Sequence, residues 1–459
     1  MTTLPQDASP GIADADPGAI DARLPQHAAV PGTFQRPTHL EELPCKTAAP
    51  RRRRAAHAPD IGKTQIPLIH PNPPRLSELV DGLVQIERSG IFSNYGPMNT
   101  RLEKGLVEHV FGGDGACVTV CNATVGLMLA VKQAVGWRPR GRYVLMPSFT
   151  FAAAAHAALW CGLTPLLCDI DSETWLPDPG AEERLLERYG HKIALILPNA
   201  SFGNSLDLTH YDRLSAVYDV PVVIDAAASL GSLDAKGRAF GAGCRHPLVY
   251  SMHATKSFAT GEAGLIYCAD QERIATLRAM GNFGFGQPRS ATMPGLNSKL
   301  SEVSALLGVA KLQKFKEVAA HRHAAYELYR TLLPQFTFQR MTGQRTAHQF
   351  VSILLPRALA GQVPDVIAEL GREGIGAGRY FVPHIAEQPF FRRACVSGDL
   401  PVTNDISGRV IALPISDVIR PAEVVLVCDT LTRICRERAG GQTARRPKSP
   451  AAQTTEAPR

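Results

Sequence analysis

Residues 143–169 read YVLMPSFTFAAAAHAALWCGLTPLLCD. Tyr143–Met146 and Pro165–Asp169 are short and mostly apolar, which is typical of strands that are buried on both faces of a sheet. Ala152–Leu159 lies between them and has the alanine content of a helix. Two strands that are joined by a crossover helix lie parallel in one sheet. This stretch therefore predicts a strand-helix-strand unit.

The same alternation continues on both sides of this unit. It predicts an α/β fold with a mainly parallel sheet and helices on both faces. The further expected elements are the strands Ala116–Cys121, Ile193–Leu197, Val222–Asp225, Leu248–Met252 and Leu265–Cys268, and the helices Val125–Val135, Ala181–Tyr189 and Tyr211–Tyr218.

Beyond about Lys314 the pattern changes to a long helix, Phe315–Leu332, followed by scattered elements. It predicts a large α/β domain over residues 65–314 and a smaller C-terminal α+β domain over residues 315–438. Residues 1–64 and 439–459 are rich in Pro, Ala and charge without a hydrophobic period, and they are expected to be disordered extensions. The elements expected in the smaller domain are the strand Gln349–Leu355 and the helices Pro364–Glu373 and Pro421–Arg436.

Composition narrows the class of protein. The chain has 459 residues and 45% apolar content, enough for a sizeable core. Part of the excess of Lys and Arg over Asp and Glu lies in the two ends of the chain, including Arg51–Arg54. The net charge of residues 65–438 is therefore small, which argues against nucleic-acid binding. Ten cysteines without a CxxC motif predict reduced thiols. No signal-peptide pattern or membrane-length apolar run occurs, so we expect a cytoplasmic protein with no membrane partner.

The chemistry is expected just after the strands, because ligands of parallel sheets bind beyond the carboxyl ends. Ala123 and Thr124 open a helix, where a phosphate could dock or where the residues could simply cap it. Asp225 ends an apolar strand and could be a cap, an ion-pair partner or the partner of a protonated ring nitrogen. Lys256 follows a strand in the segment Ser251–Gly264, although most lysines are surface charges.

Together, a phosphate-type helix start, a strand-end aspartate and a strand-end lysine are the parts needed to bind pyridoxal 5′-phosphate (PLP). The motifs of other common cofactor and metal sites, such as the P-loop, GxGxxG and HExxH, are absent from the sequence. No metal site is expected.

The segment from Phe92 to Arg436 resembles the DegT/DnrJ/EryC1/StrS family of PLP-dependent aminotransferases, which has the aspartate aminotransferase-like fold (fold type I). The motifs that carry the resemblance occur in the family's order. They include Asn94-Tyr-Gly-Pro, Phe202-Gly-Asn-Ser-Leu-Asp, Val223-Ile-Asp-Ala-Ala, Thr260-Gly-Glu-Ala-Gly, Gly295-Leu-Asn-Ser-Lys-Leu-Ser-Glu and Leu413-Pro-Ile.

The resemblance implies roles for individual residues. Lys256 matches the lysine that forms a Schiff base with PLP and then moves protons. Asp225 matches the aspartate that keeps the ring nitrogen protonated. Phe151 matches the aromatic residue that stacks on the ring, although a core role is also open. Ala123, Thr124 and Ser251 match phosphate-binding positions, and Asn297 resembles the asparagine that reaches the phosphate from a neighbouring subunit, which implies a homodimer.

Departures from the family leave the reaction type open. The family usually has a glutamine at the position of Ala228, where it contacts the phenolic oxygen of the cofactor. The segments that line the family's sugar site contain Tyr95, His253, Glu262, Tyr380 and His384, each of which could instead pack or cap.

The resemblance thus implies amino transfer from an amino acid, with glutamate as the expected donor, to a nucleotide-linked keto sugar in amino sugar or polysaccharide biosynthesis. The alternatives are a non-sugar carbonyl acceptor, a PLP reaction other than transamination, and a PLP-binding regulatory protein.

Overall fold

The computed structural model describes residues 65–443. Residues 1–64, predicted as one extension, and residues 444–459 of the other, predicted over 439–459, lie outside the described residues. At the centre of the described part is a sheet made of two four-stranded portions, and parallel bridges from Ile196 to Val222 and from Asn199 to Asp225 join them. The strand order is β1 (Ala116–Val120), β7 (Gly264–Cys268), β6 (Leu248–Ser251), β5 (Ile224–Asp225), β4 (Ile193–Ile196), β2 (Tyr143–Pro147), β3 (Thr164–Cys168) and β10 (Val396–Ser397).

The strand directions confirm the predicted fold class. β7 runs antiparallel to β1 and β6, and the other neighbouring strands of this sheet run parallel. Apart from β10, which the sequence did not predict, the strands lie within a residue or two of the expected ranges, because continuous apolar runs between polar turns mark strands that are buried on both sides.

Alternate residues of the strands feed two hydrophobic cores, one on each face of the sheet. In β2, Tyr143 and Leu145 join one core, whereas Val144 and Met146 join the other. This is the period of two that a strand imposes on its side chains. The helices of the first core include α2 (Pro97–His109), α5 (Pro179–Tyr189) and α6 (Leu208–Tyr218), and those of the second include α3 (Ala123–Val135), α4 (Ala152–Trp160) and α7 (Gln271–Met280).

The longest helix, α8 (Glu302–Leu332), begins earlier than the sequence indicated. The prediction that this helix starts at Phe315 is wrong, because Ser301 caps it by accepting a hydrogen bond from the Ser304 N–H at 3.2 Å. Gly308 weakens the helical pattern in the sequence, but it allows close packing, since a Cβ there would stand 2.6 Å from a methyl carbon of Leu102 in α2. α1 (Val80–Ser89), which the sequence analysis did not anticipate, also packs on α8.

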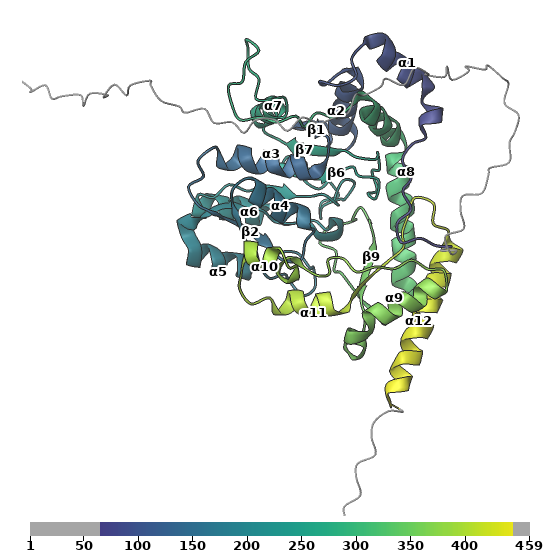
Figure 1. Ribbon diagram of the computed structural model, residues 1–459. Helices are drawn as coiled ribbons and strands as arrows, with labels where there is room; N and C mark the ends of the chain where they lie inside the picture. The colour runs from purple at the N-terminus through teal and green to yellow at the C-terminus, as the bar shows by residue number, and fades with distance from the viewer. Residues whose placement is uncertain (1–64, 444–459) are drawn as a thin grey trace, which may run out of the picture. The chain divides into compact units, whose positions relative to one another are not determined.

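A third hydrophobic core includes residues from the second half of α8. Tyr326 and Tyr329 of α8 belong to it, together with apolar residues of a small antiparallel sheet. The strand order of that sheet is β11 (Val410–Leu413), β9 (Val351–Leu354) and β8 (Thr337–Phe338). Two further helices, α9 (Val363–Arg372) and α12 (Pro421–Thr443), contribute to this core and lie near the second half of α8 (Figure 1). α10 (Phe391–Ala394) belongs to the second core, and α11 (Pro401–Arg409) to a fourth core that includes Phe149 and Phe202.

The end of α12 also differs from the expected end at Arg436. The helix continues to Thr443, because the sequence supplies no helix-breaking proline before Pro447. No helix in residues 65–443 is long and apolar enough to cross a membrane. The cysteines of this part of the chain are free thiols.

Candidate active site

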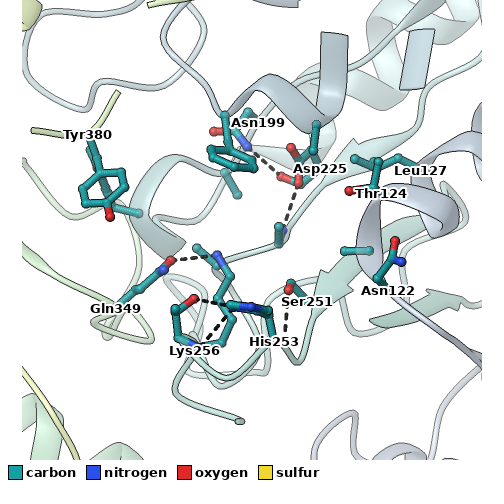
Figure 2. Close-up of a pocket in the computed structure, with 18 of the residues that line it drawn as sticks. Asn122, Thr124, Leu127, Asn199, Asp225, Ser251, His253, Lys256, Gln349 and Tyr380 are labelled. Atoms are coloured by element: carbon teal, nitrogen blue, oxygen red, sulfur yellow. Dashed lines mark hydrogen bonds between the residues drawn. The ribbon is translucent and has the colours of Figure 1, made fainter. Parts of the chain in front are cut away.

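A cavity of about 640 Å³ lies at the carboxyl ends of β5 and β6. Asn122 and Thr124, at the start of α3, line one side of it, and Gln349 and Tyr380 line the opposite side (Figure 2). The sheet and the C-terminal part of the chain therefore both contribute walls. This is the edge of a parallel sheet at which ligands bind.

Lys256 lies in a turn that follows β6. The turn is closed by hydrogen bonds from the Lys256 N–H to the His253 carbonyl at 2.9 Å and from the Ala254 N–H to the Gly261 carbonyl at 2.7 Å. The amine of Lys256 donates to Oε1 of Gln349 at 2.8 Å (Figure 2). Burial lowers the pKa of Lys256 to about 8, although the carboxylate of Asp225 acts in the opposite direction. The neutral amine, which is the nucleophilic form, is thus accessible near pH 8.

Asp225 is the last residue of β5, and its side chain is 3% exposed. One carboxylate oxygen accepts a hydrogen bond from the Ala227 N–H at 3.1 Å, and the Asn199 amide donates to the Asp225 backbone carbonyl at 3.4 Å. Burial raises the pKa of Asp225, against the opposing effects of the Ala227 N–H and Lys256. A cationic N–H in the cavity would stabilise this carboxylate.

The start of α3 forms a corner that is suited to an anion. Asn122 accepts a hydrogen bond from the Val125 N–H at 3.0 Å, whereas the N–H groups of Ala123 and Thr124 belong to the first turn, which has no intrahelical acceptors. Both residues line the cavity, as does Ser251 at the end of β6. Backbone N–H groups and the helix dipole at such a start bind phosphate.

Aromatic side chains form much of the remaining wall. Phe151, the residue before α4, lines the cavity and is 61% exposed. Phe202 and Phe381 stack with a centroid distance of 5.2 Å, and Phe350 and Tyr380 stack at 4.4 Å. Flat apolar walls of this kind suit a planar ring ligand.

These features fit PLP. The cavity offers an amine of lowered pKa for the aldehyde, a buried carboxylate for the ring nitrogen, and a helix start for the phosphate. In the part of the chain that the structure describes, no group of three or more His, Cys, Asp or Glu side chains could hold a metal ion.

The structure brings most of the residues singled out in the sequence to this cavity. His253 and Glu262 lie close together at its edge, with 3.3 Å between Nε2 and Oε1. The contact is an ion pair when the histidine is protonated. The other singled-out residues that line the cavity are Ala123, Thr124, Phe151, Asp225, Ala228, Ser251, Lys256 and Tyr380.

Tyr95 and His384 do not line this cavity, contrary to the expectation that they contact substrate there. The Tyr95 hydroxyl donates to the Arg278 carbonyl at 3.3 Å, and the guanidinium of Arg278 lies 4.5 Å from the ring. His384 is 1% exposed, and its two ring nitrogens lie 2.8 Å from Ser148 Oγ and 2.9 Å from Asn404 Oδ1. Both side chains are engaged in packing and hydrogen bonding elsewhere.

Asn297 also lies outside the cavity of its own chain. It is exposed and forms an isolated bridge with Asn282. Its expected contact is with the cofactor of a second subunit, so that role stays a prediction.

Several residues of the cavity were assigned no role from the sequence. Asn199 follows β4, and its position after a strand already marked it as an informative residue. Gln349 reaches Lys256 across a separation of 93 residues. Phe202 and Phe381 approach each other from distant segments, and no local pattern in the sequence pairs them.

Comparison with protein families gives one model that spans most of the described region. Residues 76–432 match the model of the DegT/DnrJ/EryC1/StrS aminotransferase family. The match includes all of the strands and most of the residues that line the cavity.

Individual proteins are similar over comparable lengths. Protein Rv3402c of Mycobacterium tuberculosis is 34% identical over 370 residues, which cover 79% of this chain and 88% of that protein. The dTDP-4-amino-4,6-dideoxy-D-glucose transaminase of Shigella dysenteriae is 30% identical over 350 residues, covering 75% of this chain and 92% of that enzyme. The crystal structure of DesI in the presence of its TDP-sugar product has 30% identity and a TM-score of 0.73, and the match covers 83% of this chain and 95% of that one.

Proposed function

We propose that this chain, which belongs to the DegT/DnrJ/EryC1/StrS aminotransferase family, aminates a nucleotide-linked keto sugar. It is a PLP-dependent aminotransferase of fold type I. The proposed amino donor is an amino acid, glutamate in the first instance. The proposed attachment point for the cofactor is the amine of Lys256.

One observation carries the proposal: Lys256, Asp225 and the start of α3 line a single cavity. The three come from separate parts of the sheet edge, and each has the chemistry that one part of the cofactor requires. When bound, PLP supplies an electron sink that stabilises negative charge on the substrate carbon.

The chain's own residues would then bind and orient the cofactor and move protons. The first turn of α3 and Ser251 would hold the phosphate, and Phe151 would pack against the ring. The carboxylate of Asp225 would hold the proton of the ring nitrogen, because a buried anion favours a cation beside it. The amine of Lys256, with its pKa of about 8, can accept and return a proton near neutral pH.

The sugar part of the proposal rests on similarity and on the polar rim of the cavity. The Shigella enzyme is named for a dTDP-linked amino sugar, and DesI was crystallised with a TDP-sugar product. His253, Glu262 and Tyr380 line the cavity of this chain and offer hydrogen-bonding groups to sugar hydroxyls. Tyr95 and His384 are left out of this substrate site.

We also propose that the enzyme is a cytoplasmic homodimer with a large domain over residues 65–314 and a small one over 315–438. The exposed position of Asn297, outside its own cavity, supports a contact with a second copy. Sedimentation analysis of the full chain would give the mass of a dimer, and a monomer that is fully active would contradict this part of the proposal.

The test is a pair of measurements on the purified full-length protein with PLP. Reduction with borohydride followed by peptide mass mapping should place the cofactor on Lys256. Incubation with glutamate should release 2-oxoglutarate, and a dTDP-linked 4-keto-6-deoxy sugar should then gain the amino group. Lys256→Ala should abolish labelling and turnover, whereas Lys104→Ala, a substitution of an exposed lysine, should leave both unchanged.

Other outcomes separate the alternatives. Release of 2-oxoglutarate without amination of any nucleotide sugar would point to a non-sugar carbonyl acceptor. PLP bound at Lys256 without reaction with amino acids would indicate a regulatory protein or a reaction other than transamination. Labelling of a different lysine would overturn the assignment of Lys256.

A further inference from the structure

The amine of Lys256 has a direct hydrogen-bond partner that comes from outside the sheet. Oε1 of Gln349 accepts from Nζ at 2.8 Å, and Gln349 lies just before β9 (Figure 2). The charged or titratable groups that line the same cavity are Asp225, the pair of His253 and Glu262, and Tyr380. Gln349 is thus a neutral acceptor placed on the amine itself.

We propose that Gln349 is a positioning residue for Lys256, which fixes the lysine amine at the reacting end of the cavity and favours its protonated form. This inference rests on the proposed attachment of the cofactor to Lys256. A carbonyl oxygen accepts more strongly from an ammonium than from a neutral amine. Gln349 therefore opposes the effect of burial, which lowers the pKa of Lys256.

The residue before Gln349, His348, has an unusual backbone conformation. His348 has a φ of 47°, in the left-handed region that non-glycine residues rarely adopt, and its side chain is 1% exposed. Its ring nitrogens lie 3.1 Å from Nδ1 of His323 and 2.8 Å from Oγ1 of Thr346. The ring also stacks on Tyr326, with 4.3 Å between the centroids. A conformation of this kind persists only where the surroundings enforce it.

A second contact ties this segment to α8. Arg322 donates a hydrogen bond to the His348 carbonyl at 3.0 Å and forms an ion pair with Asp417, with 2.6 Å between Nε and Oδ1. Burial lowers the pKa of His348, and His323 and Arg322 lower it further, so the ring stays neutral at physiological pH. The segment that carries Gln349 is therefore anchored by the contacts of His348 and Arg322.

The test compares two substitutions with opposite electrostatic effects. Gln349→Leu removes the acceptor, whereas Gln349→Glu keeps the shape of the side chain and adds a negative charge. The readout is the apparent pKa of Lys256 in the cofactor-free full-length protein, obtained from the pH dependence of competitive labelling with acetic anhydride and peptide mass spectrometry.

We expect Gln349→Leu to lower the apparent pKa by about one unit and Gln349→Glu to raise it by about one unit, since a charge-assisted hydrogen bond corresponds to a shift of roughly this size. Gln335→Leu makes the same change at an exposed glutamine and should leave the pKa of Lys256 unchanged. Melting curves would verify that each variant folds.

Two results would overturn the inference. One is an unchanged pKa in both variants. The other is a shift in the same direction in both, which disturbed packing alone would produce. Because the measurement is made without cofactor, it is independent of the borohydride mapping that tests the attachment to Lys256. The two proposals can therefore fail separately.

Discussion

A Cβ atom at position 264 would stand 2.7 Å from the backbone nitrogen of Ala123. Gly264 at the start of β7 thus lies in contact with the first turn of α3. We predict that Gly264→Ala displaces this helix start and lowers PLP affinity by about tenfold or more, because a phosphate needs the first-turn N–H groups in place. Fluorescence titration of the cofactor-free protein with PLP would measure the change.

The matched control for that variant is Gly371→Ala. A Cβ at this exposed position in α9 would meet nothing within 4 Å. Alanine is the better helix former, so PLP affinity should stay the same and stability should not fall. Equal affinities of the two variants for PLP would contradict the role assigned to Gly264.

The lowered pKa of Lys256 gives a pH dependence. PLP uptake by the cofactor-free protein should speed up as the pH rises, with a midpoint at about pH 8, and should level off above it. The reason is that raising the pH removes the proton from the amine and exposes its nucleophilic lone pair. Stopped-flow absorbance would measure the rate, with the Lys256→Ala variant as the baseline. A midpoint near 10.5, the ordinary value for lysine, would show that the cavity does not act on the amine.

Asp225→Asn should separate stability from activity. Burial raises the pKa of Asp225, so the folded protein holds that proton more tightly than the unfolded chain does. A carboxyl group with a raised pKa lowers the free energy of unfolding at pH values above its pKa in the folded protein. This destabilisation disappears as the pH falls below the pKa of the group in the unfolded chain. The substitution should therefore raise the melting temperature of the cofactor-free protein at pH 8 and lose this advantage in acid.

In the same variant, turnover should fall by roughly 100-fold or more, the range typical for removal of one electrostatic partner in an active site. The melting curve and the 2-oxoglutarate assay check the two effects independently. Full activity in Asp225→Asn would remove this carboxylate from the mechanism.

Asp417 should contribute strongly to stability. It pairs with Lys311 at 2.5 Å and with Arg322 at 2.6 Å, and all three side chains are nearly fully buried. Burial raises the pKa of Asp417, but the two cations together lower it more, so its stabilising effect is present at neutral pH and is lost as the pH falls through its folded pKa. Asp417→Ala should cost about 3 to 5 kcal/mol, because two buried cations lose their partner.

Urea denaturation at pH 7 would measure that loss. Glu373→Ala breaks an ion pair with Arg433 in which both side chains are about half exposed, so it should change the unfolding midpoint very little. Similar losses in the two variants would contradict the importance of burial.

The sequence predicted the sheet well, because its strands are continuous apolar runs between polar turns. It failed at the start of α8, where the apolar and small residues before Phe315 pack against α2, while Gly308 interrupts the helical pattern that sequence analysis relies on. Packing against neighbouring helices overrides local propensity there.

Within the site, Lys256 and Asp225 were identifiable because each follows a strand, and position after a strand is readable from local sequence. Tyr95 and His384 were considered for the substrate site because they lie in segments that match those lining the family's sugar site, with packing as the alternative. The direction of a side chain depends on its partners, however, and theirs are Arg278 and Ser148. Gln349 could not be anticipated, since its contact depends on how distant segments fold together.

α8 connects two parts of the protein: α1 and α2 pack on it, and its Arg322 bonds the segment that precedes β9. With 31 residues it is about 46 Å long, and Arg322 lies about 30 Å from its Glu302 end. A tilt of about 5° around that end would move Arg322 by about 2.6 Å, by the geometry of a rigid rod at 1.5 Å per residue. That displacement is nearly as long as the 3.0 Å hydrogen bond from Arg322 to the His348 carbonyl. The contact between α8 and the segment before β9 therefore requires that α8 keep its direction to within a few degrees.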